Sequence, residues 1–408
     1  MVIVVKRKLV AIILMLLICA LAILSSYYLT SNRSMDPNGT TLEKKEKPSD
    51  EKEHTEGNII EKTTSATILA TGDIMFHMPQ INAAYDDKNK TYDFTDNFKY
   101  VKKYIESANL SIGNFETVVA GDEIKFSGFP MFNAPKETLA AIKESGFDIL
   151  STVNNHSLDQ GKEGLINTID SIEEYGMKNI GTYKEPSSTV FIEKVNEIDV
   201  ALLSYSYGFN GMDHTLTEEE LSYMVNTIDE EKIKRDIEKA KELDADIVVV
   251  FIHWGNEYQR EPSEYQVELG RKMVEWGANI IFGSHPHVIQ KAEMINHNGK
   301  DNFIIYSMGN FLSNQRREIL NNKYTEDGIM VEVKIEKDFL KGETIIKDIN
   351  YIPTWVRKYH DAYGVQYEIL PVEDFLEDDE LRAKIDQDVE MRIKESYRET
   401  MDKMAQFY

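Results

Sequence analysis

Hydrophobic and polar positions alternate between two patterns along residues 66–315. Short apolar runs rich in β-branched residues predict strands, and longer stretches with helical punctuation predict helices. The predicted strands are Ile68–Ala70, Leu110–Ile112, Ile149–Val153, Ile247–Ile252, Ile280–Phe282 and Phe303–Tyr306. The predicted helices are Pro135–Ser145, Lys162–Tyr175, Asp229–Leu243 and Ser263–Trp276. Strands that alternate with helices are typical of an α/β domain.

The chain begins with a basic stub and a long apolar run. Leu9–Leu24 carries no charge, and the apolar character continues to residue 29, which is about the ~20 residues that a membrane-spanning helix needs. Residues 6–8 are all basic, so the positive-inside rule predicts a cytoplasmic N-terminus and an extracellular remainder. We therefore expect residues 1–30 to form a single-pass anchor in the cell membrane. A cleaved signal peptide and a lipoprotein built on Cys19 are the alternatives.

Residues 31–65 separate the apolar run from the domain. They contain almost no apolar residue, mix charges of both signs and repeat Pro, Gly, Ser and Thr. Such a composition cannot bury enough apolar surface to fold. We therefore expect a disordered charged stalk that holds the domain away from a surface.

Residues 316–408 are expected to complete the domain. Alternating patterns at Ile329–Ile335 and Thr344–Ile352 predict two further strands. From Glu373 onward the chain is acidic, and apolar residues recur at helical spacing at Leu381, Ile385, Val389 and Ile393. This pattern predicts one amphipathic helix that packs back on the domain or binds a partner.

The composition narrows the classes of function. The chain has 408 residues, with 46 Lys and Arg against 70 Asp and Glu, and a formal charge of −24. A nucleic-acid-binding protein neutralises phosphates with Lys and Arg, so this balance argues against nucleic acid as a partner. The single cysteine, Cys19, excludes disulfide scaffolds, cysteine-rich zinc sites and iron–sulfur clusters.

Each of the six predicted strands of residues 66–315 ends in a polar cluster, usually beside a glycine. In chain order the clusters read TGD, GNFE, NNH, HWG, GSHPH and SMGN. Ligands bind at the carboxyl ends of strands in α/β sheets, where loops converge. Five of the nine histidines lie at or near these ends, namely His77, His156, His253, His285 and His287. Imidazole, carboxylate and amide donors without thiolate suit Mn, Fe, Zn or a similar divalent ion, and so many donors favour two ions that share a carboxylate.

The motifs at these strand ends resemble those of a known family. The ordered set TGD, GNFE, NNHSLDQG, HWG, GSHPH and YSMGNF is similar to the CapA/PgsA family of poly-γ-glutamate capsule biosynthesis proteins, over about residues 66–315. The resemblance implies a fold like that of calcineurin-like metallophosphoesterases, a layered α/β/β/α sandwich. It also implies a membrane-anchored role in making or exporting the polymer, alongside the membrane subunits of a polyglutamate synthase.

The same resemblance implies a role for individual residues. The implied metal ligands are Asp73, Glu116, Asn155, His253, His285 and His287, with Glu116, or Asn114 as the alternative, as the residue shared by two ions. His156 would sit beside the leaving group of a substrate, and Asp159 would orient its imidazole and raise its pKa. Weaker candidates for ligands are Asn114, His77 and Glu257, and Asn310 would support a ligand by hydrogen bonding.

Two motifs depart from the metallophosphoesterase pattern. Met75 stands where an Asp-x-His motif would have its histidine, and the second motif carries Asn114 and Glu116 in place of aspartates. Three functions therefore stay open. The chain could act in polymer biosynthesis with help from a metal site, hydrolyse a phosphoester of the cell envelope, or hold an anionic polymer without catalysis.

Overall fold

A computed structural model describes residues 62–187 and 189–405. The expected anchor and nearly all of the expected stalk lie outside these residues. Strand β1 begins at Thr63, three residues before the expected start of the domain. Across the described part of the chain, no helix is both long enough and apolar enough to cross a membrane.

An eight-stranded sheet contains the first predicted strands. Its strand order is β16-β15-β14-β1-β4-β5-β6, and β13 also pairs with β1. The pairs β1–β4, β4–β5, β5–β6 and β1–β13 are parallel, whereas β14, β15 and β16 add antiparallel strands. The strands are β1 (Thr63–Ile74), β4 (Leu110–Phe115), β5 (Ile149–Ser151), β6 (Lys178–Ile180), β13 (Asn310–Leu312), β14 (Asp327–Asp338), β15 (Glu343–Asp361) and β16 (Gly364–Pro371).

A second sheet has six strands, in the order β11-β12-β10-β9-β8-β7. Its central pairs β8–β9, β9–β10 and β10–β12 are parallel. The strands are β7 (Phe191–Val195), β8 (Ile198–Ser206), β9 (Ile247–His253), β10 (Ile280–Ser284), β11 (Ala292–His297) and β12 (Lys300–Ile305). A small separate hairpin joins β2 (Tyr85–Asp86) to β3 (Thr91–Tyr92).

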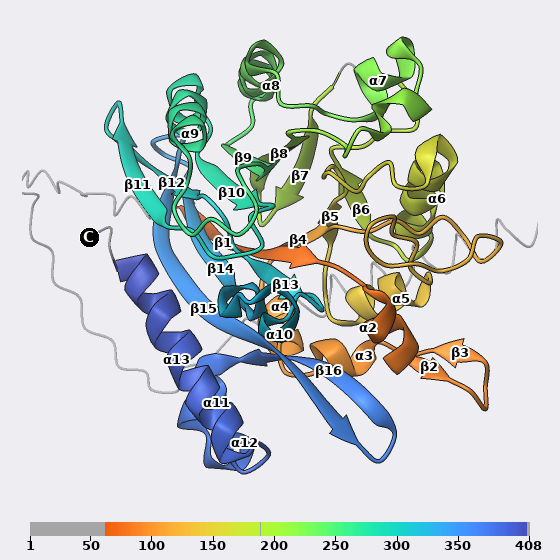
Figure 1. Ribbon diagram of the computed structural model, residues 1–408. Helices are drawn as coiled ribbons and strands as arrows, with labels where there is room; N and C mark the ends of the chain where they lie inside the picture. The colour runs from red at the N-terminus through yellow and green to blue at the C-terminus, as the bar shows by residue number, and fades with distance from the viewer. Residues whose placement is uncertain (1–61, 188, 406–408) are drawn as a thin grey trace, which may run out of the picture. The chain divides into compact units, whose positions relative to one another are not determined.

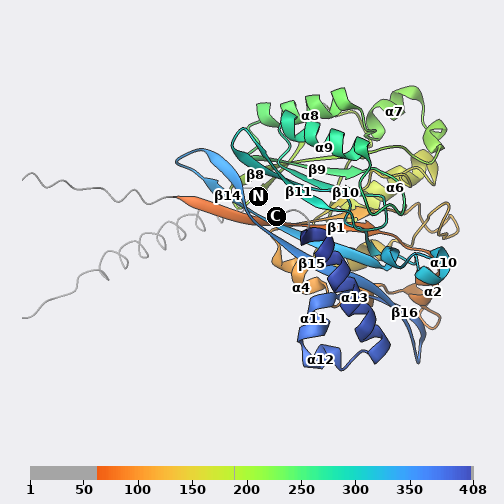
Figure 2. The same cartoon turned by 60° about the vertical axis from the view of Figure 1, so that its left-hand side comes forward.

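Helices cover the outer faces of the two sheets (Figures 1 and 2). Helices α8 (Glu230–Glu242) and α9 (Glu264–Trp276) pack on the six-stranded sheet through Ile233, Ile237, Leu269 and Met273. The other α-helices are α2 (Met78–Ala83), α3 (Thr95–Phe98), α4 (Lys102–Ser107), α5 (Glu137–Glu144), α6 (Gly161–Glu174), α7 (Glu218–Met224), α10 (Arg317–Leu320), α11 (Val372–Glu377), α12 (Asp379–Arg382) and α13 (Gln387–Met404). Two 3₁₀ helices are η1 (Met212–Thr215) and η2 (Lys323–Glu326).

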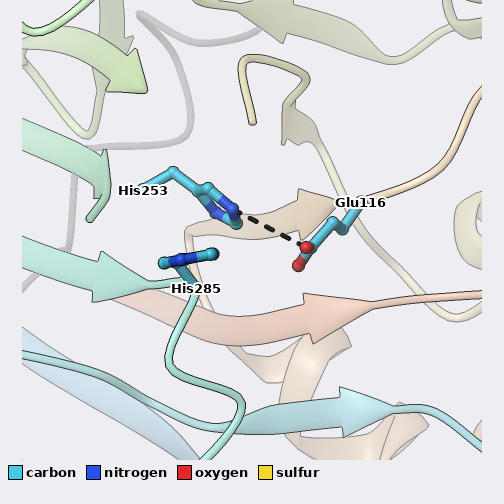
Figure 3. Close-up of side chains that lie close together, drawn as sticks. All are labelled: Glu116, His253 and His285. Carbon is cyan, nitrogen blue, oxygen red and sulfur yellow. Dashed lines mark ion pairs between the residues drawn. The ribbon is translucent and has the colours of Figure 1, made fainter. Parts of the chain in front are cut away.

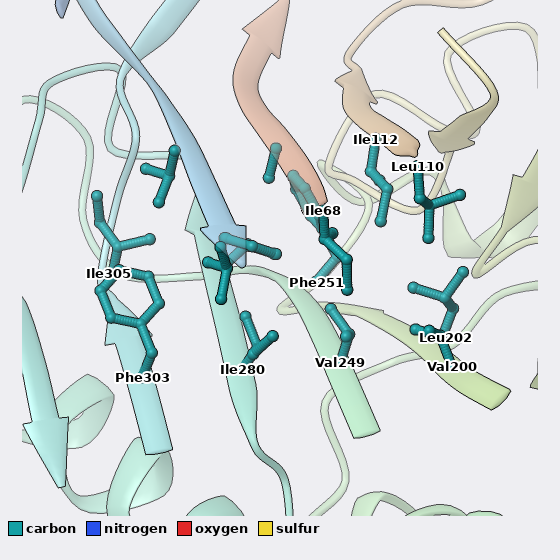
Figure 4. Close-up of a cluster of buried hydrophobic side chains, with 14 of the residues drawn as sticks. Ile68, Leu110, Ile112, Val200, Leu202, Val249, Phe251, Ile280, Phe303 and Ile305 are labelled. Atoms are coloured by element: carbon teal, nitrogen blue, oxygen red, sulfur yellow. The ribbon is translucent and has the colours of Figure 1, made fainter. Parts of the chain in front are cut away.

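The main core lies between the two sheets (Figure 4). Ile68 and Ile112 of the eight-stranded sheet share one buried cluster with Val249, Phe251 and Ile280 of the six-stranded sheet. Burying a side chain of this size stabilises the fold by roughly 1.5–3 kcal/mol, so this interface fixes how the two sheets face each other. With helices on both outer faces, the expected α/β/β/α layering is observed.

Two sequence expectations need correction. The sequence analysis missed β8, although it is a central strand of the six-stranded sheet. The single amphipathic helix expected after Glu373 is three helices, because Asp378 and Asp386 cap new helix starts with their side chains. The four apolar residues of that pattern nevertheless pack together on Trp355, Leu370 and Phe375, which is the first of the two alternatives that the sequence left open.

Candidate metal centre

The polar strand ends of both sheets meet in one buried cluster. Asp73 lies near the end of β1 and Glu116 directly follows β4, in the eight-stranded sheet. His253 is the last residue of β9, and His285 and His287 follow β10, in the six-stranded sheet. All five side chains are buried. The convergence that the sequence predicted for the three histidines is therefore observed.

Three groups of these side chains could each hold an ion. Within each group one donor atom per residue lies within 4.8 Å of the others, and the groups are Glu116–His253–His285, Asp73–Glu116–His287 and Glu257–His285–His287. Glu116 belongs to the first two groups, and Figure 3 shows its carboxylate facing His253 and His285. A carboxylate in this position suits the bridging role that the resemblance implies for Glu116.

His253 is held from both sides of its ring. Its Nδ1 lies 3.0 Å from Ser284 Oγ, and its Nε2 lies 3.0 Å from Asn155 Oδ1 and 3.6 Å from Glu116 Oε1. Asn155 therefore reaches the cluster, as the sequence predicted, through the amide oxygen that a metal ligand would use.

His287 contacts the other half of the cluster. Its Nδ1 lies 3.0 Å from Asp73 Oδ2 and 3.1 Å from Asn310 Oδ1, and its Nε2 lies 3.8 Å from Glu116 Oε1. The amide nitrogen of Asn310 donates to Gln315 Oε1 and the Thr325 carbonyl, which fixes its oxygen toward the imidazole. Asn310 thus has the supporting place expected for it.

Asn114 occupies the space between the two carboxylates. Its amide nitrogen lies 2.8 Å from Asp73 Oδ1, 3.4 Å from Glu116 Oε2 and 3.3 Å from His253 Nδ1. An amide has only two N–H groups, so it cannot donate fully to three acceptors. The sequence left open whether Asn114 or Glu116 is shared between ions, and both lie at the centre of the cluster.

The backbone at the centre has one close approach that only glycine permits and two histidines in a strained conformation. A side chain at Gly72 would lie 1.9 Å from the Gly309 carbonyl, which accepts a hydrogen bond from the Asp73 N–H at 3.0 Å. His285 and His287 adopt φ values of 97° and 57°, which side-chain-bearing residues rarely adopt. Such strain is concentrated at functional sites, where the surrounding structure maintains it.

Burial without fixed cations shifts the pKa values of the cluster. Burial, followed by the charge of Asp73, raises the pKa of Glu116 well above its usual range. Burial lowers the pKa of His253 well below its usual range and that of His285 to about 3, and the neighbouring histidines add to both shifts. Each shift favours the uncharged form of the side chain. The cluster is therefore short of positive charge.

The donors fit a divalent metal. Glu116 Oε1 and His285 Nδ1 are buried and have no hydrogen-bond partner among the described residues. Most buried polar atoms are partnered, and these two lie among further donors grouped within 4.8 Å of one another, which suits a bound ion. Neutral imidazole, carboxylate and amide oxygen are the donors that Mn, Fe or Zn accept. Bound to Asp73, Glu116, Asn155 and the histidines, such an ion would supply the missing positive charge and polarise an oxygen of a bound substrate.

His156 and Asp159 form a buried pair beside this cluster. His156 Nδ1 lies 2.8 Å from Asp159 Oδ2, which also accepts a hydrogen bond from the Phe132 N–H at 2.7 Å. The edge contact of the Phe132 ring, 4.7 Å from the imidazole between centroids, fixes the ring plane. The geometry matches the expectation that Asp159 orients His156.

The weaker candidates separate into two outcomes. Glu257 is exposed and lies with His285 and His287 in the third group, at the solvent side of the centre. His77 is in none of the three groups found in residues 62–187 and 189–405. Its Nδ1 lies 3.3 Å from both Gln80 Oε1 and the Asn314 nitrogen, so local contacts occupy that atom.

The sequence analysis missed the contributions of Ser284, Asn154 and Tyr207. Ser284 contacts His253, and the Asn154 amide nitrogen donates to the Phe115 carbonyl and lies 3.4 Å from Asn114 Oδ1. Tyr207 follows β8, and its ring stacks on His253 and contacts His285 at a tilt of 42°. The run IDVALLSYSYG, an apolar strand that ends in polar residues and glycine, carries the signal that would have revealed Tyr207.

Comparison with known proteins identifies the family. The sequence profile described as "Bacterial capsule synthesis protein PGA_cap" matches residues 67–315. The chain belongs to this family. The match ends at the residue where the sequence analysis placed the end of the motif-bearing region. Membership in the PGA_cap family confirms the resemblance to CapA proteins.

Two curated relatives of this PGA_cap chain are CapA proteins. The capsule biosynthesis protein CapA of Bacillus anthracis is 33% identical over 261 residues, which cover 61% of this chain and 60% of that protein. The PGA biosynthesis protein CapA of Bacillus subtilis (strain 168) is 29% identical over 343 residues, which cover 74% and 83%. The chain thus spans less than two thirds of the first relative.

Solved structures of other families show weaker similarity to the PGA_cap chain. The calcineurin-like phosphoesterase YfkN from Bacillus subtilis aligns with a TM-score of 0.40 and 16% identity, over 72% of this chain and 91% of that one. A phosphatase from Mycoplasma pneumoniae aligns with a TM-score of 0.41 and 15% identity, over 72% and 94%.

Proposed function

We propose that this protein is an extracytoplasmic CapA-type component of poly-γ-glutamate capsule synthesis or export. In this proposal residues 1–30 anchor it in the cell membrane, and its domain binds one or two divalent metal ions at the strand ends. It would work beside the membrane subunits of the polymer synthase. Family membership and the two CapA relatives support the capsule role, and the basic stub before an uncharged run of 16 residues, Leu9–Leu24, supports the anchor.

One observation carries the metal part of the proposal. Glu116 Oε1 and His285 Nδ1 are buried and unpartnered within a cluster that gathers donors from both sheets. Buried unpartnered atoms also occur at Arg316, Asp327 and Arg392, but among the described residues only Glu116 and His285 belong to groups of donors that lie within reach of one ion. A divalent ion between them would satisfy both at once.

Elemental analysis of the full-length protein, purified in detergent, tests the metal centre. We expect one or two equivalents of a transition metal, lost in the His253→Ala/His285→Ala double variant. His360→Ala, which alters an exposed histidine on β15, should keep the full metal content. A metal content that the double variant retains would refute the proposed centre.

Polymer production in cells tests whether the centre serves the capsule role. We expect a strain carrying Asp73→Ala/His253→Ala to lose surface polymer while the variant still accumulates in the membrane. Normal polymer production would refute the metal-dependent role and favour a non-catalytic polymer-binding scaffold. Fractionation of the same cells tests the anchor, because a cleaved protein would leave the membrane.

Metal-dependent phosphoester hydrolysis is the second candidate. The buried His156–Asp159 pair favours it, because an imidazole oriented by a carboxylate can donate a proton to a leaving group. Turnover of a phosphodiester by the purified protein with Mn²⁺, lost in His285→Ala and strongly reduced in His156→Ala, would support this activity. Full turnover in both variants would show that a different site or a contaminant is responsible.

A further inference from the structure

Three aromatic side chains lie beside histidines of the candidate metal centre or of the adjacent His156–Asp159 pair, each beside a different histidine. The distances between ring centroids are 4.5 Å for Tyr207 and His285, 6.0 Å for Tyr258 and His287, and 6.4 Å for Phe129 and His156. The three rings come from separate segments of the chain, after β4, β8 and β9. We call Phe129, Tyr207 and Tyr258 the aromatic rim.

The aromatic rim is open to solvent although the histidines below it are buried. Phe129 is 72% exposed, Tyr207 47% and Tyr258 38%. A single exposed aromatic residue needs no explanation, but several around one buried polar cluster indicate a binding surface. Aromatic rings favour stacked or edge-to-face contacts with flat groups. The aromatic rim is therefore suited to contact flat groups that flank a ligand bound at the centre.

The charges of the centre limit the ligand further. The three metal groups contain three carboxylates, those of Asp73, Glu116 and Glu257. Two divalent ions would bring four positive charges, so about one positive charge would remain for a ligand. Glu116 pairs with His253 and His287, and Asp73 pairs with His287. Within residues 62–187 and 189–405 neither carboxylate forms an ion pair with a lysine or arginine. Arginine and lysine are the side chains that commonly supply further positive charge to bound phosphate.

We propose that the centre and its aromatic rim bind a singly charged oxyanion flanked by flat groups, and discriminate against doubly charged phosphomonoesters. A phosphodiester between rings and a carboxylate beside an amide plane share this chemistry. The proposal rests on the metal centre proposed above and defines the substrate class of that centre. It assigns Phe129 and Tyr207 to specificity, because their rings extend furthest into solvent.

Calorimetric titration of the full-length, Mn²⁺-loaded protein at pH 8 tests the substrate class. The probes are diphenyl phosphate (one charge, two rings), dimethyl phosphate (one charge, no ring), phenyl phosphate (two charges, one ring) and N-benzoylglycine (a carboxylate with an amide and a ring). We expect diphenyl phosphate or N-benzoylglycine to bind at least tenfold more tightly than dimethyl phosphate and phenyl phosphate. Which of the two binds best distinguishes a phosphodiester from a carboxylate ligand.

Variants of the aromatic rim separate its role from that of the metal. We expect Phe129→Ala and Tyr207→Ala each to weaken the best ring-bearing probe by about threefold to tenfold, the effect of one aromatic contact. Binding of dimethyl phosphate and the Mn²⁺ content should stay within twofold of the parent protein. Tyr265→Ala, which removes a 49% exposed tyrosine on α9, is the matched control and should change nothing.

Three results would overturn the proposal. They are tightest binding of phenyl phosphate, rim variants that bind every probe as the parent does, and a metal-loaded protein that binds none of the four probes. All three leave the metal centre standing. A protein that takes up no Mn²⁺ would instead refute the centre itself, and metal analysis before the titration reveals that case.

Discussion

The metal centre and a second buried cluster, where α13 packs on β14, differ in the source of their positive charge. We call the second cluster, formed by Arg316, Glu326, Asp327 and Arg392, the C-terminal ion network. Arg392 Nη2 lies 2.7 Å from Asp327 Oδ1, and Arg316 Nη2 lies 3.1 Å from Glu326 Oε1. The arginines contact two carboxylates, and Figure 1 shows α13, which carries Arg392, running beside β15.

The metal centre buries its carboxylates without any such partner. Asp73 and Glu116 face imidazoles whose ordinary pKa lies near 6.5, and burial lowers the pKa of His253 further. Burying a charge is costly unless an opposite charge compensates it. The C-terminal ion network carries its cations in the chain, whereas the compensating charge that we propose for the metal centre is a divalent ion. The buried carboxylates of the C-terminal ion network are therefore compensated within the chain, and those of the metal centre are open to compensation by a bound cation.

The largest effect should come from removing the cation of the network. Arg392→Met leaves Asp327 and Glu326 buried without their shared guanidinium, so we expect a loss of about 3–5 kcal/mol in the free energy of unfolding. Denaturant titration of the metal-free protein measures it. Arg398→Met, which removes an exposed arginine from the same helix, should cost less than about 0.5 kcal/mol. A loss below about 1 kcal/mol for Arg392→Met would mean that the two clusters do not differ as described.

Removing a carboxylate from the metal centre should act in the opposite direction on stability. Glu116→Gln keeps the shape of the side chain but removes a carboxyl group whose ionisation is disfavoured by burial and by the charge of Asp73. We expect the metal-free protein to gain about 1 kcal/mol, while metal affinity falls at least about 100-fold, or roughly 2.7 kcal/mol. Metal titration and denaturation measure the two quantities. Glu275→Gln, at an exposed position of α9, should leave both unchanged. Destabilisation of the metal-free protein by Glu116→Gln would contradict the comparison.

The two clusters also differ in how far the sequence predicts them. The donors of the metal centre lie at strand ends, and parallel strands bring their carboxyl ends together, so Asp73, His253 and His285 could be placed from motifs alone. The C-terminal ion network has no such rule. Asp327 and Arg392 are 65 residues apart in sequence, and their contact depends on how α13 docks.

Local features that depend on tertiary contacts were likewise not predictable from the sequence. The spacing of Leu381 and Val389 fits one helix, but the capping aspartates divide it, since a capped start competes with helix continuation. His77 is a candidate in the sequence because it lies near the end of a predicted strand, yet Gln80 and Asn314 contact its ring instead. Composition and spacing thus predict which residues gather, and side-chain packing decides which of them touch.

Lowering the pH should reduce the free energy of unfolding through His77, which lies near the metal centre, because arginines do not titrate in this pH range. Burial lowers the pKa of His77 to about 4, against about 6.5 in an unfolded chain. Between these values the unfolded chain binds a proton that the folded chain does not, so stability falls as the pH falls from about 6.5 to about 4. We expect His77→Gln to reduce this loss by about 1–3 kcal/mol in metal-free protein denatured at several pH values. His360→Gln, at an exposed position, should leave the pH profile unchanged, and an equal change in both variants would refute the assignment.

The last prediction concerns Asn114, whose amide N–H groups face the carboxylates of the centre. Its nitrogen donates to Asp73 Oδ1 at 2.8 Å, just as the exposed Asn350 donates to Glu332 Oε2 at 2.8 Å. Asn114→Asp replaces this donor by a third carboxylate beside Asp73 and Glu116. Without metal the added repulsion should cost about 1–2 kcal/mol, and with metal the new charged ligand should tighten binding about tenfold, or roughly 1.4 kcal/mol.

Asn350→Asp is the matched control for Asn114→Asp, because it creates the same like-charge pair at the surface, where water screens it. It should change the free energy of unfolding by less than about 0.5 kcal/mol and metal affinity not at all. If Asn114→Asp destabilised the metal-free protein without tightening metal binding, Asn114 would be a structural donor outside the ion's reach. If stability fell and metal affinity rose as expected, the amide of Asn114 would be the group that stabilises the two neighbouring carboxylates in the metal-free protein.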